Sequence, residues 1–152
     1  MDDGRTTYTR ATYGAFVEGD SFEWQTTAYR VDLKSVEGMH GDQINKIRFY
    51  LNNGENSPYL GGGSGRFYNY DVEHDDYITE VKFKIGSELN SLTLTTNSGK
   101  IFKIGGAGGT TEHSFTMDSK VHIVGLYGTK SATHVLSLGL ILSEEARTPS
   151  DS

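Results

Sequence analysis

The sequence contains no cysteine, two prolines and a single tryptophan among its 152 residues. Without cysteine there is neither a disulfide framework nor a thiolate metal site, so the redox state of the compartment is not constrained. No apolar run approaches the length that crosses a bilayer, so no membrane span is expected. The start, Met-Asp-Asp-Gly-Arg, lacks the apolar stretch of a secretory signal, which indicates a cytosolic chain or a mature or excised fragment and leaves the localisation open.

Basic residues do not cluster in the sequence, and the formal net charge is −6. A surface of this charge would repel a polyanion, so nucleic acid is not expected as a partner. A single domain of this length buries roughly 70% of the surface that its unfolded chain exposes, so no metal or disulfide is needed for folding.

Glycine and aromatic residues are abundant, with 19 glycines, 9 tyrosines and 7 phenylalanines. Together with many threonines in short alternating runs, they favour strands and tight turns, and we predict an all-β fold. Turns are expected at residues 52–54 and 97–99, where asparagine and glycine tolerate positive φ. Alternation with a period of two predicts core-facing side chains at Val31, Leu33, Ile47, Phe49, Val81, Phe83, Ile85, Leu92, Leu94, Leu138 and Leu140.

A weak repeat recurs three times along the chain. In each copy a glycine-rich turn leads through two strand-like runs to a second glycine, which is Gly38, Gly86 or Gly128, and then to a third strand. The turns are residues 14–19 (the N-terminal glycine loop), 61–65 (GGGSG, the first glycine loop) and 105–109 (GGAGG, the second glycine loop). Three similar pieces that share one core are therefore expected, within a domain at 13–142 flanked by flexible termini at 1–12 and 143–152.

Other kinds of site are poorly supported by the residues. The run Asp71, Glu73, His74, Asp75 and Asp76 could suit a hard cation, but strand alternation would separate its members, so solvated charges are expected and no metal. The glycine loops lack the Lys-Ser/Thr of a P-loop, and no nucleophile setting of a hydrolase is present. An enzyme is therefore not expected. Trp24 is expected to pack on the core, with a sugar-stacking platform as the alternative.

One stretch, EVKFKIGSELNSLTLTTNSGKIFKIGGAGG, resembles the jacalin-related lectins in its order of strand, loop, Thr-Asn turn and Gly-Gly-x-Gly-Gly. VHIVGLYG followed by LSLGLIL resembles the closing strands of that family, and GDSFEW and INKIRFYLNNG are similar to lectin domains fused to aerolysin-like pore formers. The resemblance covers about residues 13–142. It implies a β-prism I fold, in which three Greek-key sheets of four strands surround a pseudo-threefold axis.

The resemblance also implies a noncatalytic lectin for mannose- or glucose-type sugars. In that family a G-x-x-x-D loop faces a glycine-rich loop, so that backbone N–H groups donate to sugar oxygens while the carboxylate accepts sugar O–H bonds. No metal or cofactor is required. The expected partners are mono- or oligosaccharides or glycoproteins, and a homodimer is compatible with the family.

Three sites are implied, and they differ in what they keep. The first has the intact spacing and a carboxylate, and comprises Gly38, Met39, His40, Gly41 and Asp42 opposite Gly62 and Gly63. The second has an amide in place of the carboxylate, and comprises Gly86, Glu88, Asn90, Gly106 and Gly108. The third, with Lys130, Thr133 and His134 opposite the N-terminal glycine loop, has Ala132 and Leu136 at the glycine and aspartate positions and is expected to be lost or altered.

Two other functions stay open. A β-prism without sugar affinity would serve as a protein-interaction or assembly domain, which the degraded third site favours. The chain would otherwise be the targeting domain of a pore-forming toxin.

Overall fold

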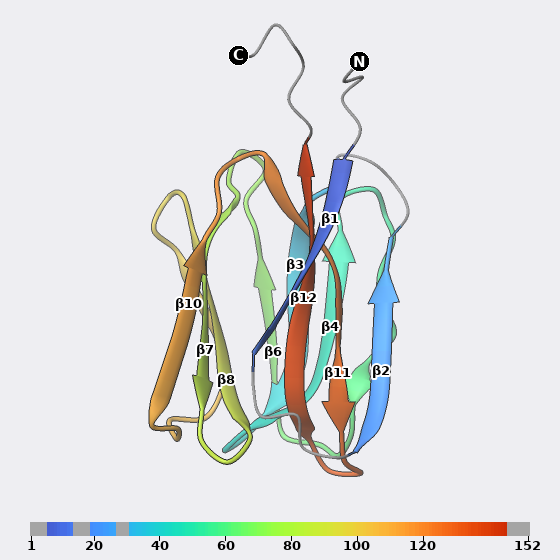
Figure 1. Cartoon of the computed structure of the whole chain (residues 1–152), viewed down its shortest axis with the longest axis vertical. Coiled ribbons are helices and arrows are strands. Elements are labelled where there is room, and N and C mark those ends of the chain that lie inside the picture. The colour runs from blue at the N-terminus through green and yellow to red at the C-terminus, as the bar shows by residue number, and fades with distance from the viewer. Residues whose placement is uncertain (1–5, 14–18, 27–30, 146–152) are drawn as a thin grey trace, which may run out of the picture.

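The structure is a computed structural model that describes residues 6–13, 19–26 and 31–145. These residues form twelve strands and no helix, so none of them belongs to a helix long and apolar enough to cross a membrane. The strands form three antiparallel sheets of four (Figure 1).

Each sheet has the same strand order. The first sheet contains β3 (Leu33–His40), β4 (Ile44–Leu51), β5 (Leu60–Gly61) and β6 (Arg66–Asp71), in the order β5-β4-β3-β6. The second sheet contains β7 (Ile78–Ile85), β8 (Leu89–Thr96), β9 (Ile101–Gly105) and β10 (Thr111–Thr116), in the order β9-β8-β7-β10. In both, the fourth strand returns to lie beside the first, which is the Greek-key arrangement.

The third sheet joins the two ends of the chain. It contains β11 (Val121–Lys130), β12 (Val135–Glu145), β1 (Thr6–Tyr13) and β2 (Asp20–Gln25), in the order β1-β12-β11-β2. The same Greek key is therefore completed by strands from opposite ends of the sequence. The expected all-β prism of three four-stranded sheets is confirmed. The sequence repeat does not coincide with the sheets, because β2 belongs to the third sheet and β3 to the first.

The core is one cluster of buried apolar side chains between the three sheets. All eleven positions predicted from alternation are buried, and Ile47, Phe49, Val81, Phe83, Leu92, Leu138 and Leu140 have no exposed surface. Trp24 is partly buried and packs against this cluster, as expected. The predicted turns are also present, with φ of +92° at Gly54 and +95° at Gly99.

The ends of the domain differ from the expectation. Residues 6–12, predicted as part of a flexible terminus, form most of β1, which pairs with β12 from Thr6↔Glu145 to Tyr13↔Leu138. Strand β12 likewise continues to Glu145, beyond the predicted limit of 142. Polar composition does not lead to fraying here, because backbone pairing between β1 and β12 holds both segments in the third sheet. Residues 1–5 and 146–152 lie outside the described residues.

All the β-hairpin turns that bear on the expected sites lie at one end of the prism, the lower end in Figure 1, where β3, β7 and β11 end.

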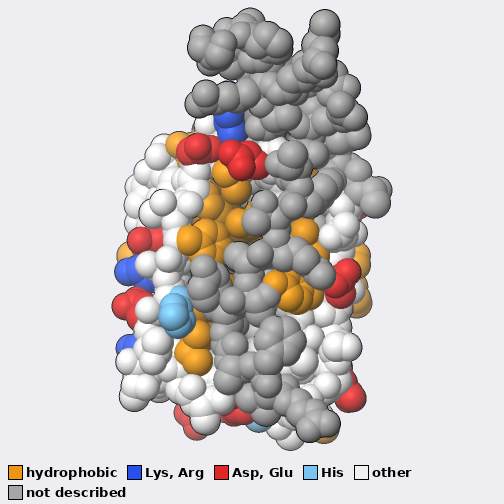
Figure 2. All heavy atoms as spheres, viewed as in Figure 1, with side chains coloured by type: hydrophobic (Ala, Val, Ile, Leu, Met, Phe, Trp, Pro, Cys, Tyr) orange, Lys and Arg blue, Asp and Glu red, His pale blue; other side chains and the backbone are white. Residues whose placement is uncertain are grey.

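On the face drawn in Figure 2, the basic side chains that are visible lie beside acidic ones rather than in an extended basic area.

Candidate functional site

Three equivalent turns lie at this end of the prism. In the first sheet the Gly41 N–H donates to the carbonyl of Gln43 at 3.0 Å, and in the second the Gly86 N–H donates to that of Glu88 at 3.0 Å. In the third sheet the Ser131 N–H donates to the carbonyl of His134 at 2.9 Å, so this turn is one residue longer. Each turn follows a register shift at the end of its strand.

This equivalence corrects the expected register of the first site. Gly41, and not Gly38, corresponds to Gly86, so Asn45 rather than Asp42 corresponds to Asn90. Gly38 pairs with Ile47 inside β3, and a methyl group there would lie 2.3 Å from the Lys46 carbonyl oxygen. Close packing between strands therefore requires this glycine. Met39 and His40 also belong to β3 rather than to a loop.

The first glycine loop packs against Asn45 and against the turn of the third sheet. The Gly62 N–H donates to the Asn45 carbonyl at 2.8 Å. A methyl group on Gly62 would lie 2.5 Å from the Ala132 carbonyl oxygen, and one on Gly63 would lie 2.4 Å from that of Thr133. The expected facing of Asp42 and this loop is therefore wrong, and the amide of Asn45 is engaged, since its Nδ2 donates to the Thr133 carbonyl at 2.8 Å.

The second glycine loop lies between Asn90 and Asp42. The Gly106 N–H donates to the Asn90 carbonyl at 3.1 Å, and a methyl group on Gly106 would lie 2.3 Å from the Asp42 carbonyl oxygen. A methyl group on Gly86 would lie 3.1 Å from Asn90 Oδ1, and so would one on Gly109. Residues 86–90 and the second glycine loop are thus brought together, as predicted for the second site.

The side-chain oxygen of Asn90 is one of two shielded polar atoms beside this loop that have no hydrogen-bond partner among the described residues, the other being His40 Nε2. Oδ1 is shielded from solvent and has no hydrogen-bond partner among the described residues. A shielded polar atom without a partner costs about 1–3 kcal/mol, so a donor from a ligand or a water molecule would be favourable here. On the other side of the loop, Asp42 is exposed and makes no hydrogen bond to a described residue.

The third site lacks the corresponding polar atom. Leu136 occupies the position of Asn45 and Asn90, is buried, and would lie 2.8 Å from a methyl group on Gly19. Lys130 ends β11 and pairs with Asp20. Residues 14–18, which contain most of the expected N-terminal glycine loop, lie outside the described residues.

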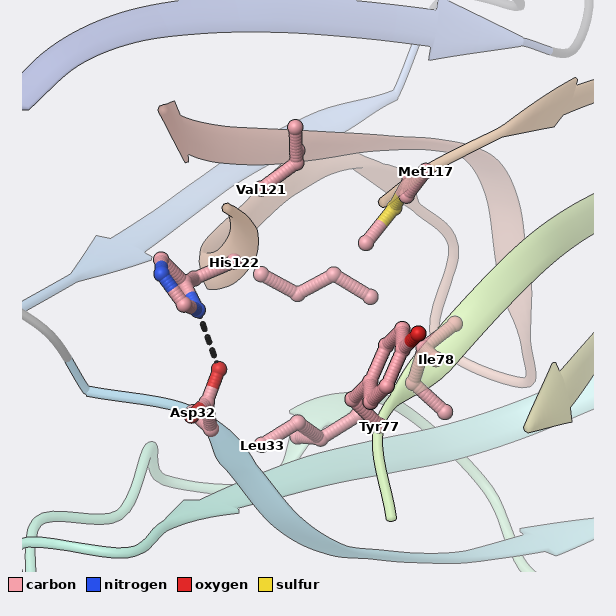
Figure 3. Close-up of a pocket in the computed structure, with 8 residues that line it drawn as sticks. Asp32, Leu33, Tyr77, Ile78, Met117, Val121 and His122 are labelled. Carbon is pink, nitrogen blue, oxygen red and sulfur yellow. Dashed lines mark hydrogen bonds and ion pairs between the residues drawn. The ribbon is translucent and has the colours of Figure 1, made fainter. Parts of the chain in front are cut away.

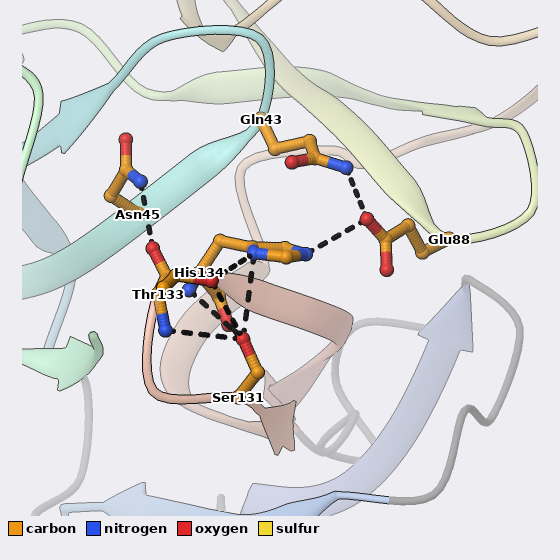
Figure 4. A network of polar contacts seen from close by, with 6 residues as sticks. All are labelled: Gln43, Asn45, Glu88, Ser131, Thr133 and His134. Carbon is orange, nitrogen blue, oxygen red and sulfur yellow. Dashed lines mark hydrogen bonds and ion pairs between the residues drawn. The ribbon is translucent and has the colours of Figure 1, made fainter. Parts of the chain in front are cut away.

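A polar network joins the three turns (Figure 4). Gln43, Glu88 and His134 hold equivalent places, each just before the first buried residue of the returning strand, and their side chains converge. Gln43 Nε2 donates to Glu88 Oε1, and His134 Nε2 lies 2.8 Å from the same oxygen. Glu88 and His134, predicted as sugar contacts of two different sites, are hydrogen-bonded to each other.

His134 makes hydrogen bonds through both ring nitrogens. A carboxylate oxygen only accepts, so His134 Nε2 carries the hydrogen and donates to Glu88. His134 Nδ1 lies 2.9 Å from the Thr133 hydroxyl. The Ser131 hydroxyl accepts the N–H groups of Thr133 and His134 at 3.1 and 3.2 Å, which holds the longer third turn in shape.

His40 connects the first sheet to the second glycine loop. Its Nδ1 accepts the Gly105 N–H at 2.6 Å, and Gly105 has a φ of +118° that favours glycine. The Tyr68 ring stands edge-on against the imidazole, with centroids 4.0 Å apart. His40 therefore positions the second glycine loop beside Asn90.

One small cavity lies at the opposite end of the prism. A cavity of about 10 Å³ is lined mostly by apolar side chains, with Asp32 bonded to His122 Nδ1 at its edge (Figure 3). This volume is about that of one water molecule and excludes a sugar.

The acidic run at the end of β6 takes part in contacts with the neighbouring turn. Across the residues described, no three His, Cys, Asp or Glu side chains are placed to hold a metal. Asp76 instead holds the turn at 97–99, because its Oδ1 accepts the N–H groups of Tyr77 and Ser98, both at 3.0 Å. Glu73 pairs with Lys100 at 2.6 Å.

These features define a class of protein: a β-prism of three Greek-key sheets with glycine-rich loops gathered at one end. A family model described as the Jacalin-like lectin domain matches residues 8–141. The chain therefore belongs to the jacalin-like lectin domain family, whose members are noncatalytic carbohydrate-binding proteins.

Solved structures agree with this fold. Malaysian banana lectin is 24% identical, with a TM-score of 0.71, over 93% of this chain and 99% of that one. Calystegia sepium agglutinin is 19% identical, with a TM-score of 0.69, over 92% and 97%. A mannose-binding jacalin-related lectin from Ananas comosus is 19% identical, with a TM-score of 0.71, over 89% and 96%. No curated protein matches the sequence.

Proposed function

We propose that this protein is a noncatalytic lectin that binds mannose- or glucose-type sugars between residues 86–90 and the second glycine loop. The observation that carries the proposal is the shielded, unpartnered Oδ1 of Asn90, framed by Gly86 and Gly109. A sugar hydroxyl is a donor of the required kind, and backbone N–H groups of the loop are suited to the ring and hydroxyl oxygens.

Asp42 belongs to the same proposed site, although it comes from the neighbouring sheet. Its backbone lies against Gly106, and its exposed carboxylate makes no hydrogen bond to a described residue. A ligand that extends past Gly106 would therefore meet a charged acceptor. The loop backbone is held by Asn90 and His40 on either side, which limits the ordering cost of binding a small ligand.

Calorimetric titration with methyl α-mannoside and methyl α-glucoside tests this site. Asn90→Ala removes one neutral hydrogen bond, and we expect binding to weaken about three- to tenfold. Asn90→Asp supplies the charge-assisted acceptor and is expected to strengthen binding by a similar factor. Asn97→Ala, in the exposed turn at the other end of the prism, is the matched control. Equal affinities for all four proteins would rule out Asn90 as a contact.

A second candidate function is a protein-interaction or assembly domain. Its supporting observation is that none of the three equivalent positions, Asn45, Asn90 and Leu136, carries a carboxylate. A glycan array without binding, together with a solution mass that rises with concentration, would favour this function over the lectin.

A further inference from the structure

The outer face of the first sheet contains a hollow that is separate from the glycine loops. Its volume is about 370 Å³, within the range of small-ligand sites. It lies over β3, between side chains of β6 on one side and Tyr50 of β4 on the other. Its lining comprises Lys34, Ser35, Glu37, Tyr50, Phe67, Asn69 and Asp71.

The strand register explains why this face is hollow. Ser35 stands between Asp71 and Tyr50, and Glu37 stands between Asn69 and Arg48. Ser35 is short, and the Glu37 side chain is tied toward β4. The outer face of β3 is therefore recessed between its neighbours β4 and β6.

Glu37 is held by three donors on one oxygen. Its Oε1 accepts the hydroxyl of Tyr59 at 2.8 Å, the hydroxyl of Tyr50 at 3.1 Å and Arg48 at 3.4 Å. The Arg48 guanidinium lies 4.2 Å from the centre of the Tyr59 ring. Burial, and then the hydrogen bond to Glu37, raise the pKa of Tyr59, so its phenol keeps the proton that it donates.

The other oxygen of Glu37, Oε2, makes no hydrogen bond to a described residue, and the side chain is 15% exposed. This is an oriented carboxylate oxygen with its full capacity to accept O–H bonds. The first sheet thus provides, on its outer face, the kind of acceptor that Asn45, Asn90 and Leu136 do not provide at the end of the prism.

Phe67 supplies an apolar surface next to this acceptor. It is 53% exposed, and among the described residues only Ile101 is a more exposed large apolar side chain. An exposed ring beside hydrogen-bonding groups matches the two faces of a hexose, because the C–H face of the sugar packs on an aromatic ring while its hydroxyls meet polar groups. Asn69 and Lys34 add donors at the rim.

We propose that this hollow is a second carbohydrate site, which takes a neutral hexose ring of an oligosaccharide against Phe67 and the free oxygen of Glu37. The charges favour a neutral ligand, since Glu37 is paired with Arg48 and Asp71 is balanced by Lys34 in the lining. The site is independent of the glycine loops, so it does not rest on the function proposed for them.

Amide chemical shifts of the ¹⁵N-labelled full chain, titrated with mannotriose and with cellotriose, test the proposal. We expect at least one of the trisaccharides to shift the amides of Phe67, Asn69 and Tyr50. Phe67→Ala should weaken the binding about tenfold, since it removes the stacking surface. Ile101→Ala, which truncates the other exposed large apolar side chain described, on the second sheet, should leave it within about twofold.

A second pair of variants separates this site from the loop site. Glu37→Gln keeps an acceptor for the two phenols and is expected to weaken the trisaccharide severalfold, whereas Asn90→Ala should leave the shifts at Phe67 unchanged. Shifts at the hollow without shifts at residues 105–109 would support this proposal and count against the loop site. Two results would overturn the second-site proposal: no shifts at the hollow with either trisaccharide, or a Phe67→Ala protein that binds as wild type. The proposal would also fail if the sole effect of Phe67→Ala were a change in solution mass.

Discussion

Removal of the Glu88 carboxylate is the sharpest test of how the three sheets are held together at the loop end. In Glu88→Ala, Gln43 Nε2 and His134 Nε2 lose their common acceptor. Hydrogen bonds to a charged group contribute about 1.5–3 kcal/mol each when water cannot replace them. The His134 and Glu88 side chains are 19% and 21% exposed, so water can replace part of the loss. We therefore expect the free energy of unfolding to fall by about 1–3 kcal/mol.

Urea denaturation followed by tryptophan fluorescence measures this loss, because Trp24 packs against the core. Glu112→Ala is the matched control, since Glu112 is 56% exposed and its ion pair with Lys82 is long at 3.9 Å. That control should stay within about 0.5 kcal/mol of wild type. A double-mutant cycle with Gln43→Ala should give a coupling energy of about 0.5 kcal/mol or more. If Glu88→Ala and Glu112→Ala unfold at the same urea concentration, the network does not join the sheets.

Two further variants test the packing and the acid range. Gly106→Ala places a methyl group 2.3 Å from the Asp42 carbonyl oxygen and should lower both the free energy of unfolding and the sugar affinity. Gly41 has open space around it, so Gly41→Ala should preserve both. Calorimetric unfolding and sugar titration of the two variants measure the difference. Partial burial raises the pKa of Asp76, but hydrogen bonds from Ser98, Thr96 and Tyr77 outweigh it and lower the pKa to about 2. Asp76 therefore stabilises the fold above its ordinary pKa, and this contribution is lost as the pH falls toward 2, so thermal unfolding of Asp76→Asn should depend less on pH between 4 and 2.

The strands and the core were predictable because their signals are local. Alternation marked Val81, Phe83 and Ile85 as buried without any knowledge of their partners. Strand β1 was missed for the opposite reason, since its pairing partner Val135–Glu145 lies at the other end of the chain. Nothing in the local sequence of residues 6–12 reports that pairing.

Two glycines satisfy the spacing expected of the first site. Gly38 stands four residues before Asp42, and Gly41 stands four residues before Asn45. The carboxylate favoured the first choice, whereas the hydrogen bond from Gly41 to Gln43 and its counterpart from Gly86 to Glu88 establish the second. The bulge at the end of β3, which the spacing does not reveal, accounts for the difference.

The network of Gln43, Glu88 and His134 was also beyond the sequence, although one signal was available. Each of the three residues directly precedes the apolar residue that begins the returning strand, so the repeat places them at equivalent points. Whether equivalent side chains meet depends on the angle between the sheets, which no local pattern contains. The hollow beside Phe67 was missed for the same reason, because it arises from three adjacent strands.

The most direct test of the lectin assignment is a titration of the ¹⁵N-labelled protein with methyl α-mannoside, followed through its amide chemical shifts. We expect shifts that saturate at residues 105–109, Asn90 and Asp42, with none at the turn of residues 97–99 at the other end of the prism. Saturating shifts elsewhere with these amides unmoved, or no shifts at millimolar sugar, would contradict the proposal that sugar binds beside Asn90.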